Sequence, residues 1–80
     1  MAQVHFGSDL LQYTGGVESM TIDASRVLEL KRTLGSRFPA LTARIEHMAI
    51  AIDGEIFNDA DYRDLAADAE IHFVPRTVGG

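Results

Sequence analysis

Hydrophobic positions follow two different rhythms along this 80-residue chain. Apolar and polar residues alternate in segments 2–7, 17–23, 47–52 and 70–75, which is the period-two pattern of strands with one buried face. Segment 26–38 breaks the alternation, because its valine and leucines recur at helical spacing. These segments predict the order strand, strand, helix, strand, strand, with a further short strand expected between the last two strands.

Two glycine-containing turns connect the predicted strands. Gly15-Gly16 is predicted to supply the turn of a first hairpin, whose connecting loop is long and contains apolar residues that need something to pack against. Asp53-Gly54 is a strong two-residue turn signal. It predicts that residues 55–57 pair back as the short strand.

The helix has predicted start and stop signals. Asp23 or Ser25 is expected to cap its N-terminus by accepting hydrogen bonds from the first free amides. Gly35 is expected to end it in a left-handed conformation, and Pro39 bars a straight continuation. Residues 41–48 are expected to add no more than a short helical turn or two.

The element order predicts an α+β fold in which one main helix covers one face of a mixed sheet of four or five strands. A strand after the helix is parallel to an earlier one only through a right-handed crossover. Tyr62 and Leu65 are expected to anchor the polar segment 58–69 to the core. The other sheet face is left open to solvent or to a partner.

Composition and charge narrow the function classes. The chain is 46% hydrophobic and 24% charged, as in ordinary globular domains, and its net charge of −5 argues against nucleic-acid binding, which requires a basic stripe. The acidity serves solubility or attracts a basic partner. No apolar run approaches the roughly 20 residues that cross a bilayer, and no signal peptide is recognisable. A cytoplasmic protein without membrane contact is expected.

Candidate catalytic groups are scarce. The chain has no cysteine, which excludes disulfides and a thiol nucleophile. His5, His47 and His72 lie far apart in the sequence, so neither a metal site nor a bound cofactor is expected. The carboxylates are scattered as on a solvated surface. The chain is therefore expected to be a carrier or a substrate of other enzymes, and not an enzyme itself.

The segment "PRTVGG" closes the sequence with properties unlike those of the rest. Residues 76–80 would span about 17 Å when extended, which is enough to enter a partner's cleft. Gly79 and Gly80 lack Cβ atoms and fit a narrow channel, and the β-branched Thr77 and Val78 favour the extended form. We expect a domain over residues 1–75 and a flexible tail over residues 76–80.

The element order, "DGEIFND", "DLAADAEIHFVP" and the closing "VGG" together resemble the MoaD/ThiS family of ubiquitin-like sulfur carriers, which includes the small subunit of molybdopterin synthase. The resemblance covers essentially the whole chain and implies the β-grasp fold. Two positions depart from the family pattern. Asp68-Ala69 stands where a glycine-aspartate turn is common, and Arg76 follows Pro75 where a second proline is common. An arginine four residues before the last glycine also occurs in ubiquitin.

The resemblance implies a reactive C-terminus. A ubiquitin-activating-type enzyme would use MgATP to adenylate the carboxylate of Gly80, and a persulfide sulfur donor would convert it into a thiocarboxylate for a downstream synthase. Arg76, Thr77, Val78 and Gly79 would occupy the partner's cleft. The chain can also be the small subunit of such a synthase.

The resemblance also implies a docking surface, formed by Ile56, His72 and Val74 on the open sheet face beside the tail. Two other functions stay open. One is a ubiquitin-like modifier joined through Gly80 to lysines of other proteins. The other is a β-grasp interaction module whose tail does no chemistry, such as a phage tail-assembly protein. The sequence does not name the final sulfur acceptor.

Overall fold

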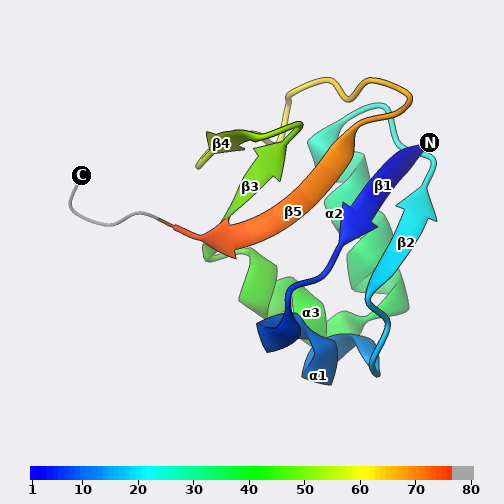
Figure 1. Cartoon of the computed structure of the whole chain (residues 1–80), viewed down its shortest axis with the longest axis vertical. Coiled ribbons are helices and arrows are strands. Elements are labelled where there is room, and N and C mark those ends of the chain that lie inside the picture. The colour runs from blue at the N-terminus through cyan, green and yellow to red at the C-terminus, as the bar shows by residue number, and fades with distance from the viewer. Residues whose placement is uncertain (77–80) are drawn as a thin grey trace.

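The computed structural model describes residues 1–76, which form a five-stranded mixed sheet with helices against one face (Figure 1). In sheet order the strands are β2 (Ser19–Ile22), β1 (Ala2–His5), β5 (Glu70–Pro75), β3 (Met48–Ile52) and β4 (Glu55–Phe57), so β5 is the middle strand. β1 pairs in parallel with β5, and the other neighbouring pairs are antiparallel. The helices are a 3-10 turn (Ser8–Leu10), α1 (Leu11–Thr14), α2 (Val27–Arg37) and α3 (Pro39–Ile45).

The predicted α+β architecture and the strand order along the chain are confirmed, but the prediction of one main helix is incomplete. α3 is a second helix that follows α2 after a single residue. Pro39 stands at its start, where the missing amide hydrogen leaves no hydrogen bond unmade. Leu41 and Ile45, one turn apart, are both buried. This i, i+4 pair was the signal for a helix in a segment predicted to hold a turn or two.

The predicted N-terminal cap of α2 is wrong. The capping position is Arg26, and it makes no side-chain cap hydrogen bond. Ser25 acts as a donor instead: its backbone N–H and its hydroxyl donate to a carboxylate oxygen of Glu29, at 2.8 and 3.0 Å. These bonds lower the pKa of Glu29, the backbone bond most. The first turn of α2 is thus tied to the preceding segment by its own glutamate.

Gly35 does not end α2 in a left-handed conformation, because the helix continues to Arg37. Gly35 lies where α2 meets α3. A Cβ atom on it would come within 2.5 Å of the Oγ1 atom of Thr42. The glycine therefore permits the close approach of two helices, and Pro39 alone marks the boundary between them.

Both predicted glycine turns are confirmed. Gly15 and Gly16 have φ angles of 66° and 89°, and Asp53 and Gly54 have 49° and 89°. Two successive positive φ angles between antiparallel β3 and β4 are those of a type I′ hairpin turn. The predicted loop before Gly15 contains short helical turns that bury Leu10, so its apolar residues do pack into the core.

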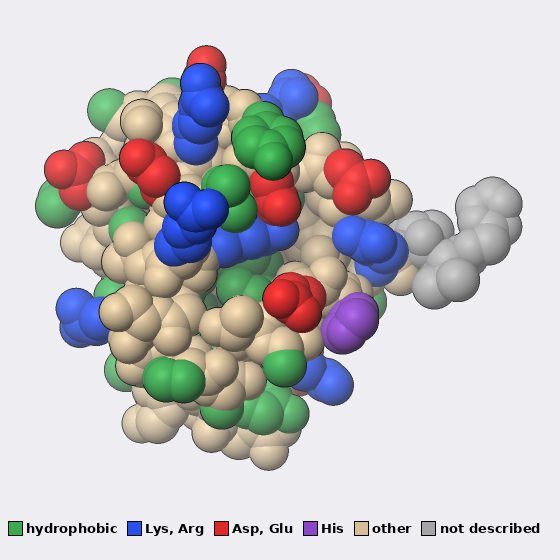
Figure 2. Space-filling view, turned by 180° about the vertical axis from the view of Figure 1, so that it is seen from behind, with side chains coloured by type: hydrophobic (Ala, Val, Ile, Leu, Met, Phe, Trp, Pro, Cys, Tyr) green, Lys and Arg blue, Asp and Glu red, His purple; other side chains and the backbone are tan. Residues whose placement is uncertain are grey.

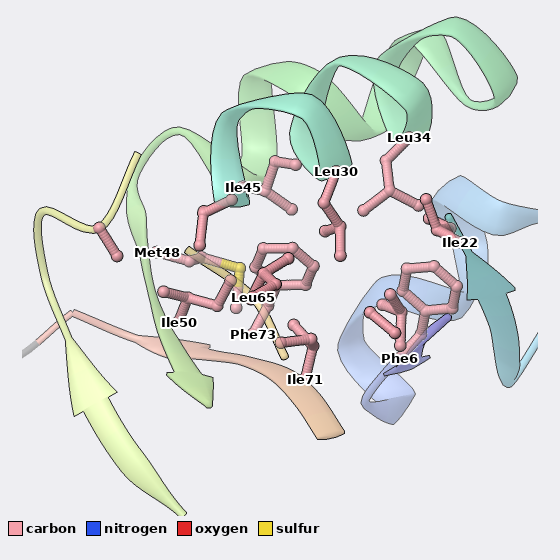
Figure 3. Close-up of a cluster of buried hydrophobic side chains, with 14 of the residues drawn as sticks. Phe6, Ile22, Leu30, Leu34, Ile45, Met48, Ile50, Leu65, Ile71 and Phe73 are labelled. Atoms are coloured by element: carbon pink, nitrogen blue, oxygen red, sulfur yellow. The ribbon is translucent and has the colours of Figure 1, made fainter. Parts of the chain in front are cut away.

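The core lies between the sheet and the helices, as Figure 3 shows. Alternate residues of each strand point into it, including Ile71 and Phe73 of β5, and the Leu30–Leu34 stripe of α2 meets them from above. Leu65 is buried and anchors the long connection between β4 and β5, as predicted. Tyr62 is 79% exposed, so its predicted role as an anchor is wrong. The carbonyls of Asp61 and Arg63 on either side of it accept hydrogen bonds from the first amides of α2, so the backbone holds this part of the loop and the ring does not.

Candidate functional site

The face of the sheet opposite the helices is open, and the outward residues of its strands form its surface (Figure 1). The register places Ala51 of β3 opposite both His72 of β5 and Ile56 of β4. Val74 lies one step further along β5, opposite Ala49. The three residues predicted as a partner interface therefore share one face. That they bind a partner stays a prediction.

The apolar character of this open face is concentrated at β3, β4 and β5. Ile56 is 62% exposed, and its strand, β4, lies at the edge of the sheet. Ala49 and Ala51 are buried beneath their larger neighbours. Because alanine side chains are short, they leave Ile56 on one side and Val74 on the other as the projecting apolar groups.

A pair of histidines adjoins this apolar area, and sequence reasoning missed it. His5 of β1 and His72 of β5 are directly opposite in the parallel register. Their rings are stacked, with centroids 4.7 Å apart and planes inclined by 17°. The Nε2 atom of His5 lies 3.3 Å from a carboxylate oxygen of Glu70. Separation along the chain was a poor guide, because the β1–β5 pairing joins the two ends of the sequence.

The tail begins at a fixed point beside the open face. β5 ends at Pro75, and the guanidinium of Arg76 donates a hydrogen bond of 2.9 Å to the backbone carbonyl of Asn58, just after β4. Arg76 is therefore held against the end of the β3–β4 hairpin. The other predicted tail residues, Thr77, Val78, Gly79 and Gly80, lie outside the described residues.

Arg76 also borders a cavity of about 480 Å³ on the helix side. Figure 2 shows this side, where charged side chains surround a hollow with an apolar floor. Leu28 and Ile45 are among its apolar lining residues. At its rim the ammonium of Lys31, the single lysine of the sequence, donates to a carboxylate oxygen of Asp61 at 2.7 Å. The Lys31 side chain is 22% exposed and already paired.

The sequence matches no protein-family model, and comparison with curated proteins gives no match. Solved structures do resemble the chain. A chain of the BexX/CysO complex from Amycolatopsis orientalis superposes with a TM-score of 0.84 at 19% identity, covering 100% of both chains. Small archaeal modifier protein 1 (SAMP1) from Methanosarcina acetivorans gives 0.81 at 19% identity, covering 99% of this chain and 95% of that one. SAMP1 from Haloferax volcanii gives 0.76 at 22% identity, covering 99% and 98%.

This chain has the ubiquitin-like β-grasp fold. The resemblance to the MoaD/ThiS type, read from the sequence, is thereby confirmed for the fold. A fourth similar structure, a putative molybdopterin converting factor subunit 1 from Pyrococcus furiosus, has a TM-score of 0.71 at 16% identity and covers 95% of this chain and 97% of that one. Among residues 1–76, no helix is long and apolar enough to cross a membrane.

Proposed function

We propose that this β-grasp protein is a sulfur carrier that works through the carboxyl group of Gly80. One observation carries the proposal: β5 contributes His72 and Val74 to the open face and then runs directly into the tail at Arg76. A partner docked on that face therefore also lies next to the beginning of the tail. The proteins of similar structure include CysO, crystallised in a complex with BexX, and a putative molybdopterin converting factor subunit.

The chemistry supplied by the carrier is that of an activated carboxylate. A carboxylate is a poor electrophile, because its charge is delocalised and oxide is a poor leaving group. A ubiquitin-activating-type partner would transfer AMP from MgATP to the Gly80 carboxylate and release pyrophosphate. A persulfide sulfur would then displace AMP and form an acyl disulfide. Cleavage of that disulfide by a second thiol would leave the thiocarboxylate, which passes its sulfur to a downstream synthase.

The tail residues have separate roles in this proposal. Arg76 fixes the tail's origin through its hydrogen bond to the carbonyl of Asn58. Thr77 and Val78 favour an extended backbone that lies along a groove. Gly79 lets the last peptide pass a narrow channel, because it has no Cβ atom. The chain itself supplies no catalytic side chain and needs no bound cofactor in this scheme.

A protein modifier is the second candidate, and it shares the activated state. It is favoured by the similarity to two proteins named small archaeal modifier protein 1, and by Arg76, an arginine four residues before the last glycine as in ubiquitin. A lysine amine of another protein would then displace AMP and form an isopeptide bond. An interaction module without tail chemistry, of the phage tail-assembly kind, is the third candidate.

Mass spectrometry of the protein recovered from its own host separates these functions. A carrier is expected to give an intact mass heavier by the difference between sulfur and oxygen, located at Gly80. A modifier is expected to leave Thr-Val-Gly-Gly on lysines of other proteins after trypsin, because trypsin cuts after Arg76. Finding neither product while the activating enzyme is present would refute both and leave the interaction module.

Two variants test the site itself in a reconstituted activation assay. Deletion of Gly80 should abolish AMP transfer, because the new terminal carboxylate, on Gly79, lies one residue short of the position at which the activating enzyme would adenylate Gly80. Ile56→Glu should weaken activation by placing a charge in the apolar part of the open face. Tyr62→Glu is the matched control, since it adds the same charge at an exposed apolar residue beside α2 and away from that face. Equal activity of Ile56→Glu and Tyr62→Glu would exclude the open face as the docking site.

A further inference from the structure

His5 and His72, two side chains of a metal-binding type, lie beside each other on the open face. The two rings come from neighbouring parallel strands, and their centroids are 4.7 Å apart. Imidazole nitrogen is the ligand most often used for Zn²⁺ and similar ions.

We propose that His5 and His72 together bind a divalent transition-metal ion of the zinc type on the open sheet face. An imidazole nitrogen binds Zn²⁺ at about 2.0–2.1 Å, which puts the metal about 3.2 Å from the ring centroid. Two rings on one ion, at an angle of about 90–110°, then have centroids about 4.5–5.2 Å apart. The observed 4.7 Å falls within that range. The ring planes are inclined by only 17°, and the nitrogen lone pairs lie in those planes, so binding of one ion requires the rings to turn about their Cβ–Cγ bonds out of the stacked arrangement.

Glu70 prepares His5 for this role. Its carboxylate lies 3.3 Å from Nε2 of His5, so a proton on Nε2 is favoured and Nδ1 keeps its lone pair. A carboxylate behind a ligating histidine fixes the tautomer, orients the ring and raises its basicity. Glu70 precedes His72 by two residues on the same strand and therefore lies on the same face. One strand thus carries both the second ligand and the support for the first.

The site is open, with two protein ligands. Within residues 1–76, no group of three or more His, Cys, Asp or Glu side chains is arranged to hold a metal ion. Water or a ligand from a docked molecule completes the coordination, as in metal sites that keep exchangeable positions. The negative net charge of −5 favours the approach of a cation. The neighbours of the site are Ala51 and Ile56, so a bound ion would lie in the same surface as the proposed docking residues.

The test is titration of the metal-free, full-length protein with Zn²⁺ alone, followed by calorimetry and by NMR of the histidine ring protons. One ion is expected per chain, with ring signals of His5 and His72 shifting together. His5→Ala and His72→Ala should each weaken binding by more than about tenfold, because each removes one arm of a chelate. Glu70→Gln should weaken it by about tenfold. His47→Ala is the matched control, since His47 is exposed and lies before β3, outside the β1–β5 pairing that joins His5 to His72.

Three results would overturn the proposal. They are the absence of binding, binding that persists unchanged in both single variants, and binding that depends equally on His47. The ring-proton shifts are measured on the unaltered protein, so the proposal stays testable if a variant fails to fold. Neither measurement involves Gly80 or an activating enzyme, and the outcome is therefore independent of the proposed function.

Discussion

Replacement of Gly35 by alanine tests the α2–α3 contact. Its effect on the free energy of unfolding differs between a glycine that permits a close helix contact and a glycine that ends a helix. Within a helix, alanine is more favourable than glycine by about 1 kcal/mol. The new Cβ atom would, however, lie 2.5 Å from Oγ1 of Thr42, which must move away. Moving a β-branched side chain off its rotamer costs about 0.5–1.5 kcal/mol. Gly35→Ala alone should therefore change the free energy of unfolding little.

The informative measurement repeats Gly35→Ala in a Thr42→Ala background. The hydroxyl is then gone, and the next atom, Cβ of residue 42, is 3.8 Å away, an ordinary contact distance. Gly35→Ala should now stabilise the protein by about 1 kcal/mol. With a urea m-value of about 1 kcal/mol/M for a small domain, the unfolding midpoint should rise by about 1 M.

Equal destabilisation in both backgrounds would refute this account. If the glycine ended the helix with a positive φ angle, its replacement by alanine would lower the free energy of unfolding by about 1–2 kcal/mol, whichever residue stands at position 42. The four-variant cycle with Thr42→Ala as its own control therefore distinguishes a close helix contact from a helix-ending glycine by the sign of the effect.

Two further predictions concern α2. Leu30→Ala should lower the free energy of unfolding by about 2–5 kcal/mol, because Leu30 is fully buried and its truncation leaves a cavity. Leu28 on the same helix is half-buried, so Leu28→Ala should lower it clearly less. Equal losses in denaturant titrations would contradict the packing described. The pKa of Glu29 is lowered by the hydrogen bonds from Ser25, so the unfolded chain binds this proton more readily. The stability that Glu29 adds over Glu29→Gln is thus present at neutral pH and should vanish as the pH falls through the pKa of Glu29; a difference that stays constant in acid would contradict it.

The sequence by itself determined the strands, their buried faces and the turns. Alternation placed Ile71 and Phe73 inward and His72 and Val74 outward, because successive side chains of a strand point to opposite faces wherever the strand is paired. Asp53-Gly54 identified its turn, since positive φ angles restrict the residue types that fit. Such features depend on neighbours in sequence, and a single sequence is enough to read them. Together with the family resemblance, they gave the fold class and an open face beside the tail.

Only the tertiary structure decided which distant segments meet. The pairing of β1 with β5 brought His5 to His72, and no local pattern specifies a partner strand. The same holds for Gly35, whose place in the sequence suggested a helix end but whose close neighbour is Thr42 on α3. The hydrogen bond from Arg76 to the carbonyl of Asn58 likewise joins residues far apart in the sequence, and no local pattern predicts it. Local periodicity indicates whether a side chain faces the core or the solvent. Which residues become its neighbours depends on how the whole chain packs into one core.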